Sequence, residues 1–278
     1  MWPQRERGTN DPMASATPRI PVARRGRRAA LSIAVWGAAV GLTACGSHSS
    51  GGSGLASRSP AQIVDAAQAA LRSARSFVAA GTLRQGSQAM TLRIVNGGRS
   101  KLEMRFDEGG KSAEIIAAEG NGYVRANEKF WSAQAGEIAA RIAHRWIELP
   151  SSTSRQFTSG LGQFAPDTLA RCLGENLGRL SHAGDTTVDG TRAVVVRQAG
   201  NVPGSNPGTI TVAATGPAYP LRVTSTGPTR PGGKVDACND GKGGDVQGSL
   251  TLSDFDHAPA VVAPRHAVKV GDLAGSSA

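Results

Sequence analysis

Apolar and polar residues alternate along much of the middle of the chain. Between residues 102 and 106 the apolar side chains of Leu102, Met104 and Phe106 alternate with charged ones, and residues 90–94 and 113–117 keep a similar period. A period of two places apolar side chains on one face of a strand and polar ones on the other. The pattern therefore predicts a sheet with one apolar face and one face in water.

Short segments that contain glycine separate these stretches, at residues 85–86, 96–98, 108–110 and 120–122. Such segments favour tight hairpins, which join antiparallel neighbours. The sequence therefore predicts an antiparallel meander. It should continue through a hairpin of residues 123–126 and 129–131, and strands should resume over residues 186–188, 193–197, 209–213, 221–224 and 249–255.

Three stretches show helical spacing. In the first, Ser59, Pro60 and Gln62 have the order of an N-cap, a first-turn proline and the closing residue of a capping box, and apolar residues then recur to about residue 74. Further helices are predicted over residues 133–144 and 166–177. An apolar sheet face needs a cover, and these helices are the covers that the sequence offers. The predicted fold class is α+β, in a single domain.

A separate pattern marks the N-terminal part of the chain. Arginines precede thirteen apolar or small residues, 29–41, which lead into Leu42, Thr43, Ala44 and Cys45. This order is typical of a secretory signal, and its last four residues resemble the bacterial lipobox, in which the cysteine thiol receives a lipid. The alternative is a membrane-spanning anchor. Residues 29–42 would reach roughly 21 Å as a helix, short of the ~30 Å hydrocarbon core.

These features divide the chain into four parts. Residues 1–44 are predicted to be a lipoprotein signal peptide and residues 45–58 a flexible tether rich in Gly and Ser. The folded domain is expected over residues 59–268, with a C-terminal tail at 269–278. The pattern leaves open whether translation starts at Met1 or Met13, and whether export follows the general or the twin-arginine route.

Charge changes this picture little. The chain has 31 basic and 21 acidic residues. Seven of the basic and two of the acidic ones precede Cys45, which leaves 24 and 19, a net charge of +5. The basic residues are scattered, whereas a nucleic-acid surface needs them clustered. We expect a membrane as partner and no nucleic acid. The sequence leaves the oligomeric state open.

Two cysteines remain if Cys45 carries a lipid. In an oxidising compartment outside the cytoplasm, Cys172 and Cys238 are expected to form a disulfide. The alternative is a pair of buried thiols. The bridge would secure a long segment, residues 225–247, that is rich in Gly and Pro.

Motifs for catalysis or metal binding give no positive signal. The histidines lack metal spacing, and neither a nucleophile elbow nor a phosphate-binding loop occurs. Residues 236–241 have a distant likeness to a calcium loop, but a cysteine stands at its third position, so a polar surface loop is the better interpretation. We expect no enzyme activity, no metal and no cofactor.

The apolar sheet face is the remaining candidate site. If the helices do not fill it, an apolar pocket results; if they do, it is an ordinary core. The predicted pocket lining is Leu92, Ile94, Leu102, Met104, Phe106, Ile115 and Ala117.

Several short motifs occur in the order found in actinobacterial lipoproteins of the LppX/LprG type, which the chain resembles from about residue 59 to residue 264. Besides the lipobox and the tether, the motifs are Gly122-Tyr123-Val124, Phe130-Trp131, Arg145-Trp146-Ile147, Thr187-Val188-Asp189-Gly190, Tyr219-Pro220-Leu221-Arg222 and residues 252–256. The resemblance implies a half-barrel similar to the LolA carriers, with helices over the concave face. In several members it implies a cavity for acyl chains, and it brings no catalytic residue.

The sequence thus predicts an exported lipoprotein, anchored through Cys45 on the outer face of the cytoplasmic membrane, that binds or carries a lipid or glycolipid. The alternative is a scaffold protein of the cell envelope with a filled core, whose partner is a protein or a cell-wall polymer.

Overall fold

One sheet contains all twelve strands of the described residues. The computed structural model describes residues 54–98 and 100–274. The strand order is β12-β6-β5-β4-β3-β2-β1-β11-β10-β9-β8-β7, and every neighbouring pair is antiparallel except β12 and β6. The strands are β1 (Phe77–Gln85), β2 (Gln88–Asn96), β3 (Leu102–Glu108), β4 (Lys111–Ala118), β5 (Asn121–Ala126), β6 (Ile147–Glu148), β7 (Leu180–Val188), β8 (Thr191–Ala199), β9 (Pro207–Ala213), β10 (Pro220–Ser225), β11 (Val246–Ser253) and β12 (Val268–Lys269).

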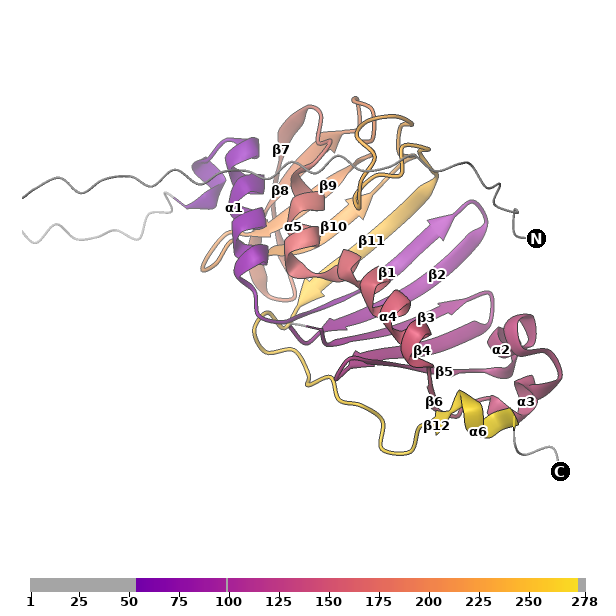
Figure 1. Ribbon diagram of the computed structural model, residues 1–278. Coiled ribbons are helices and arrows are strands. Elements are labelled where there is room, and N and C mark those ends of the chain that lie inside the picture. The colour runs from indigo at the N-terminus through magenta and orange to yellow at the C-terminus, as the bar shows by residue number, and fades with distance from the viewer. Residues whose placement is uncertain (1–53, 99, 275–278) are drawn as a thin grey trace, which may run out of the picture. The chain divides into compact units, whose positions relative to one another are not determined.

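Helices lie across one face of this sheet. Figure 1 shows α1, α5 and α4 in front of the curved sheet, and α2, α3 and α6 beside β5, β6 and β12. The predicted α+β class, a curved antiparallel sheet with helices over its concave face, is confirmed. The helices are α1 (Pro60–Ser73), α2 (Glu128–Ala135), α3 (Ala139–Ile142), α4 (Ser151–Gly160), α5 (Pro166–Gly174) and α6 (Val270–Ala274), with short 3-10 turns η1 (Leu55–Ser57), η2 (Gly136–Ile138) and η3 (Leu161–Phe164).

Strands β1 to β5 form the predicted meander. Each strand pairs with the next through a short turn, such as the one between Gln85 and Gln88, where Gly86 has a φ of +58°. A turn at Asp189 and Gly190 joins β7 to β8, and both residues have positive φ, as a type I′ hairpin turn requires. Turn chemistry and alternation together set this part of the sheet.

The two sheet faces differ as the alternation predicts. Leu102 is buried on the face that the helices cover, whereas Glu103 and Arg105 lie on the opposite face. There Arg105 Nε lies 2.9 Å from a Glu103 carboxylate oxygen, and Arg105 Nη2 lies 3.0 Å from one of Glu114. Arg125 pairs with the other oxygen of Glu114, so charges of opposite sign alternate across neighbouring strands.

Helix α1 begins as the sequence predicts. The Ser59 side chain accepts from the backbone N–H of Gln62, and the Gln62 side chain accepts from the backbone N–H of Ser59, which completes a capping box. The buried face of α1 packs on β8 and β9. This cluster contains Leu55, Ile63, Val64, Ala67, Val194, Val196, Ile210 and Val212.

Helix α5 lies beside α1 over the centre of the sheet. Gln68 Nε2 of α1 donates to the backbone oxygen of Ala170 in α5 at 2.8 Å, and Ala170 is fully buried. Leu71 of α1 and Ala170 pack with apolar residues of β1 to β4 and β11. The two helices therefore cover the sheet as a joined pair.

The chain that follows β11 covers part of the opposite face. Val261 packs there with Val78, Val95 and Ile116. The chain then returns to the far edge as β12, which pairs with β6. Apolar residues on the outer face of β1, β2 and β4 are thereby kept from water.

Three details of the predicted fold are wrong. The expected strand at residues 129–131 is the start of α2, because Asn127 Oδ1 caps this helix by accepting from the N–H of Phe130 at 2.9 Å. The expected helix over residues 133–144 is instead the end of α2, η2 and α3, and α4 was not predicted.

The folded region also extends beyond the predicted limits of 59 and 268. Leu55, within the predicted tether of residues 45–58, is buried against β8 and β9. Lys269 lies in β12 and α6 runs to residue 274, within the predicted tail.

Candidate functional site

A cavity of about 850 Å³ lies where α1 ends, α5 begins and β2 turns into β3. It is lined by segments that are far apart in the sequence. The lining consists of Arg72, Ser73, Ala74, Arg75, Asn96, Gly98, Ser100, Lys101, Leu102, Ala117, Arg155, Gly162, Ala165, Pro166 and Asp167.

The inner wall of the cavity is apolar. Leu102 of β3 and Ala117 of β4 are register partners and both are buried, at 5% and 3% exposure. Ala74, at the end of α1, is also buried and adds to this wall. The wall thus offers hydrocarbon contacts on the face of the sheet that the helices cover.

The structure brings two of the seven predicted lining residues, Leu102 and Ala117, to this cavity. Leu92 and Ile94 are buried beside Leu71 and Ala170 in the central core. Ile115 packs with residues of α2 and α3. Met104 and Phe106 are half-buried against both of these clusters. The other five predicted residues therefore lie in or against the packed core clusters.

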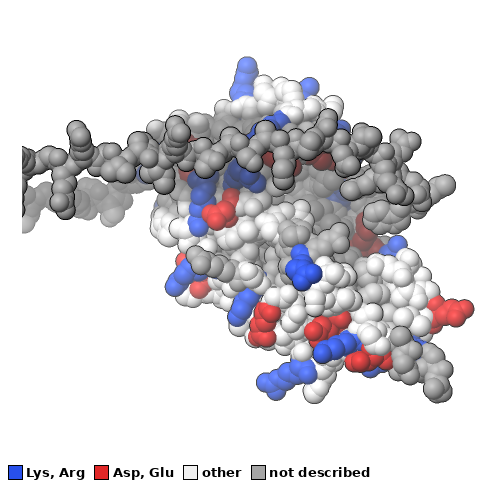
Figure 2. Space-filling view, in the orientation of Figure 1, with Lys and Arg blue, Asp and Glu red and all other residues white. Residues whose placement is uncertain are grey.

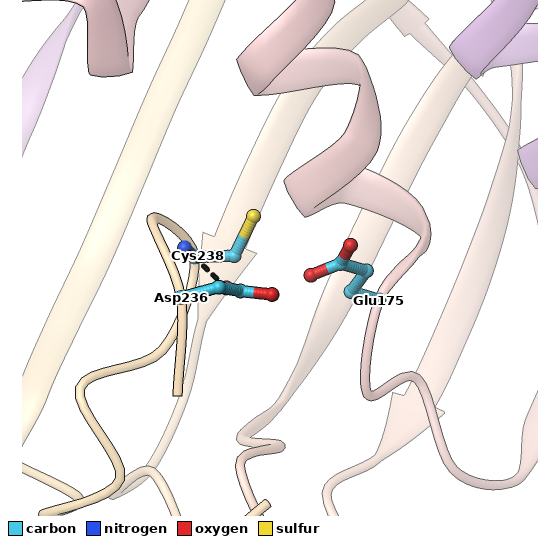
Figure 3. A group of neighbouring side chains, drawn as sticks. All are labelled: Glu175, Asp236 and Cys238. Atoms are coloured by element: carbon cyan, nitrogen blue, oxygen red, sulfur yellow. Dashed lines mark hydrogen bonds between the residues drawn. The ribbon is translucent and has the colours of Figure 1, made fainter. Parts of the chain in front are cut away.

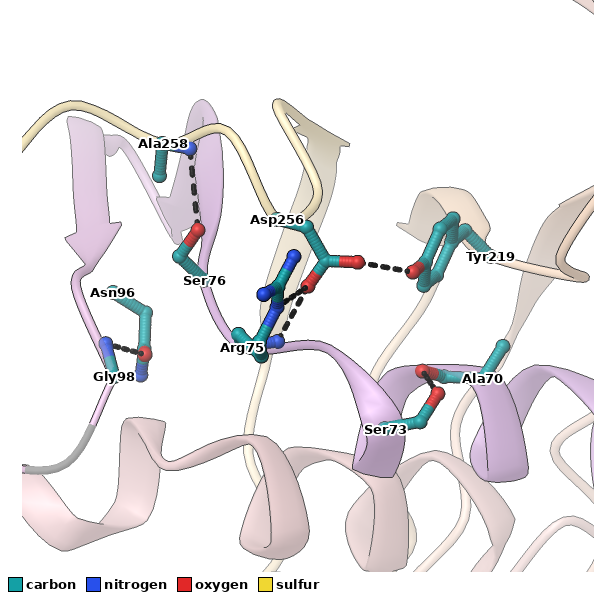
Figure 4. Close-up of polar contacts among 9 residues, drawn as sticks. All are labelled: Ala70, Ser73, Arg75, Ser76, Asn96, Gly98, Tyr219, Asp256 and Ala258. Atoms are coloured by element: carbon teal, nitrogen blue, oxygen red, sulfur yellow. Dashed lines mark hydrogen bonds and ion pairs between the residues drawn. The ribbon is translucent and has the colours of Figure 1, made fainter.

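Asn96 secures one side of the cavity. It is 3% exposed, its Nδ2 donates to the backbone oxygen of Phe164 at 3.0 Å, and its Oδ1 accepts from the N–H of Gly98 at 3.0 Å. One amide therefore joins the end of β2 to η3, and its bond to Gly98 shapes the β2–β3 turn (Figure 4). Because the amide is buried and both of its bonds are made, it ties η3, just before α5, to the sheet.

The opening of the cavity carries charged side chains. Arg72, Arg75, Lys101 and Arg155 are exposed there, together with Asp167. Figure 2 shows that basic and acidic side chains both occur on the face that carries the helices. In the cavity lining, four basic residues accompany one acidic residue. Sequence reasoning missed these residues because they come from four separate segments.

A polar contact holds the junction of α1 and β1 next to the cavity (Figure 4). Asp256 Oδ1 accepts from the backbone N–H of Arg75 at 2.7 Å, and its Oδ2 accepts from the Tyr219 hydroxyl at 3.1 Å. The Tyr219 ring stacks on Phe255 with centroids 3.9 Å apart. The Arg75 guanidinium adds an ion pair to Asp256 at 3.6 Å.

These contacts shift two pKa values. The backbone N–H of Arg75 is the largest cause that lowers the pKa of Asp256, and the Tyr219 hydroxyl and the Arg75 charge act in the same direction. Burial raises the pKa of Tyr219, and its hydrogen bond to Asp256 raises it further. Asp256 is thus held as a carboxylate that secures the C-terminal end of α1.

A disulfide joins α5 to the long segment between β10 and β11, as the sequence predicts. Cys172 and Cys238 are bonded, with Cα atoms 5.1 Å apart. Asp236 Oδ1 accepts from the N–H of Cys238 at 2.7 Å, which is the largest cause of the lowered pKa of Asp236. Lys234 Nζ lies 3.5 Å from Asp236 Oδ2.

Glu175, Asp236 and Cys238 lie close enough together to suggest a metal site (Figure 3). The sulfur of Cys238 is bonded to Cys172, however, and is not available as a thiolate ligand. Two carboxylates remain, one of them already paired with Lys234. The arrangement is better explained as part of the polar loop that the disulfide secures.

The predicted lipidation site, Cys45, and the predicted signal peptide lie outside the described residues. Within residues 54–98 and 100–274, none of the helices has the length and apolar character that a membrane span needs.

Comparisons with known proteins give similarities of fold at low sequence identity. No protein-family model matches the chain, and no curated protein matches it. The solved structure of the lipoprotein LppX from Mycobacterium tuberculosis matches 73% of this chain and 98% of its own, with a TM-score of 0.44 and 11% identity. LprF from Mycobacterium bovis matches 74% of this chain and 96% of its own, with a TM-score of 0.43 and 14% identity.

A LolA superfamily protein from Nitrosomonas europaea matches 73% of this chain and 96% of its own, with a TM-score of 0.26 and 10% identity. LppX and a LolA-like protein, both of which the sequence resemblance names, are thus among the structural matches. All three matches are at low sequence identity.

Proposed function

We propose that this chain is an exported lipoprotein, anchored through Cys45, that binds or carries a lipid or glycolipid on the outer face of the cytoplasmic membrane. The cavity beside α1 and α5 carries this proposal. Its volume of about 850 Å³ lies within the roughly 300–1,000 Å³ of typical ligand sites. Leu102 and Ala117 give it an apolar wall, and the proposal assigns the acyl chain of the ligand to that wall. No catalytic step is part of the proposal.

The anchor keeps the cavity close to the bilayer. Leu55 lies ten positions after Cys45 in the sequence and is buried in the folded region. Even fully extended, ten positions of backbone reach at most about 36 Å. The folded region, and the cavity within it, therefore stays near the membrane from which a lipid would come.

A bulky side chain at Ala117 tests the proposal. In an open cavity, Ala117→Trp should fill the space and lower the amount of bound lipid, with little change in the free energy of unfolding. Ala79→Trp is the matched control, because Ala79 is buried in the same central cluster but lies outside the cavity lining. There the added bulk should cost about 1–3 kcal/mol of stability and leave the cavity able to hold lipid in the folded fraction.

The two measurements are unfolding by urea and mass spectrometry of the lipids that co-purify with each variant. If Ala117→Trp destabilises the protein as strongly as Ala79→Trp and the parent carries no lipid, the proposal is wrong.

The scaffold alternative has one observation in its favour. Leu92, Ile94 and Ile115, which were predicted to line the pocket, are packed in core clusters. If the remaining cavity takes no lipid either, a protein or cell-wall polymer becomes the expected partner.

A further inference from the structure

Charged residues lie at the opening of the cavity, and apolar residues form its inner wall. Arg72 and Lys101 are exposed at the rim, whereas Leu102, the next residue after Lys101, is buried on the wall. A ligand that fills this cavity would meet hydrocarbon inside and cationic side chains where it emerges. An amphiphile with an apolar chain and a negatively charged end would match both environments.

The excess of positive charge remains after known pairs are subtracted. Arg75 is paired with Asp256, which lies outside the lining, and can be counted as neutral. Arg72 and Lys101 then still outnumber the one acidic residue of the lining, Asp167.

Local structure explains why a basic residue stands at only one of these two positions. Arg72 lies in the last turn of α1, where a positive charge stabilises the helix dipole. Lys101 has no such role: its backbone N–H donates to Gly98 and its backbone oxygen accepts from Gly97, bonds that any residue except proline could make. The meeting of Arg72 and Lys101 at one opening is a product of the tertiary fold.

We propose that this rim binds the phosphate of an anionic lipid headgroup while the acyl chain occupies the cavity. The inference rests on the proposed function and narrows the ligand to phosphate-bearing lipids. Arginine and lysine both bind phosphate through charge-assisted hydrogen bonds. Because the rim is exposed, salt screens these contacts, and two such cations should favour the anionic lipid by about tenfold.

The test compares two lipids that share their acyl chains, phosphatidylglycerol and diacylglycerol, each with a fluorescent tail and delivered from vesicles. The protein is the chain from Gly46 onward, which contains every residue that the structure describes. The parent should retain phosphatidylglycerol about tenfold more strongly than diacylglycerol at low salt, and less selectively at high salt.

Charge reversal at the rim should remove this preference. The double variant Arg72→Glu/Lys101→Glu should lose its selectivity for phosphatidylglycerol and keep its retention of diacylglycerol. Lys111→Glu is the control, because Lys111 is an exposed lysine at the start of a strand and lies outside the lining. It should behave as the parent does, and urea unfolding should show that both variants are folded.

Four outcomes contradict parts of this account. Equal retention of the two lipids by the parent, or unchanged selectivity in the double variant, overturns the headgroup proposal and leaves lipid binding intact. Displacement of phosphatidylglycerol by free glycerol phosphate as readily as by the intact lipid shows a site for small anions and also overturns it. Retention of neither lipid by the parent overturns the proposed function itself.

Discussion

Removing the disulfide between Cys172 and Cys238 should lower the free energy of unfolding by several kcal/mol. The bridge closes a loop over a sequence separation of 66 residues, and in the chain-entropy model a loop of that length is worth about 4 kcal/mol at 25 °C. That is a large part of the total stability of a typical domain, which is about 5–15 kcal/mol.

The effect should act mainly on the unfolded state. In the folded protein the segment between β10 and β11 has hydrogen bonds of its own: Arg230 exchanges backbone hydrogen bonds with Gly204 and Ser205, and the N–H of Gly232 donates to Gly241 at 2.8 Å. These contacts do not need the bridge. Without it the native loop should persist, while the unfolded chain becomes more expanded and gains entropy.

Urea unfolding of the double variant Cys172→Ala/Cys238→Ala and of the oxidised parent checks this prediction. The variant should have a lower midpoint and a steeper dependence of free energy on urea, because its unfolded state exposes more surface. The parent under reducing conditions should follow the variant. Equal midpoints for the oxidised and reduced parent would refute the reasoning, as would two alkylatable thiols in the exported protein.

Three further predictions concern substitutions of Asp256, Asn96 and Cys45. The pKa of Asp256 is lowered in the folded protein. The ionised carboxylate therefore contributes its full stabilisation above the ordinary carboxyl pKa of about 4, and this contribution is lost as the pH falls through the folded value. In Asp256→Asn the free energy of unfolding should fall less steeply below about pH 4 than in the parent, as measured by unfolding across a pH series. Asn96→Ala should cost about 1–3 kcal/mol in urea unfolding, because the N–H of Gly98 and the oxygen of Phe164 lose their partner, and an unchanged midpoint would contradict the role given to that amide. Cys45→Ala should abolish lipidation, so that detergent phase partitioning differs from that of the parent; identical partitioning would disprove the lipoprotein assignment.

Much of the sheet could be predicted because its signals are local. The alternation at Leu102, Met104 and Phe106 and the turn residues between strands act over a few positions. The capping box of α1 is equally local. The pairing of β1 with β11 joins residues about 170 positions apart, and no local pattern encodes such a contact.

The missed and misread helices have different causes. Phe130 and Trp131 suit a strand by propensity, but Asn127 caps a helix there and the tertiary context decides the outcome. Helix α4 is rich in Ser and Thr, which are poor helix formers. It is tied to the sheet by Ser154, whose buried hydroxyl accepts from the N–H of Gly122 and donates to the oxygen of Leu149.

The candidate site was the least predictable part. Sequence periodicity selects a sheet face, and Leu102 and Ala117 do lie on that face beside the cavity. It cannot show that Arg72 and Lys101 meet at the opening, because they belong to a helix end and a turn that are brought together only by the tertiary fold.

Mass spectrometry of the lipids that co-purify with the parent chain and with Ala117→Trp tests the central claim most directly. The account predicts that the parent, purified from the membrane of its host, carries a lipid with acyl chains, and that Ala117→Trp carries much less while it unfolds at nearly the same urea concentration. A parent chain that is folded and free of lipid, with a variant that differs from it only in stability, would contradict the claim.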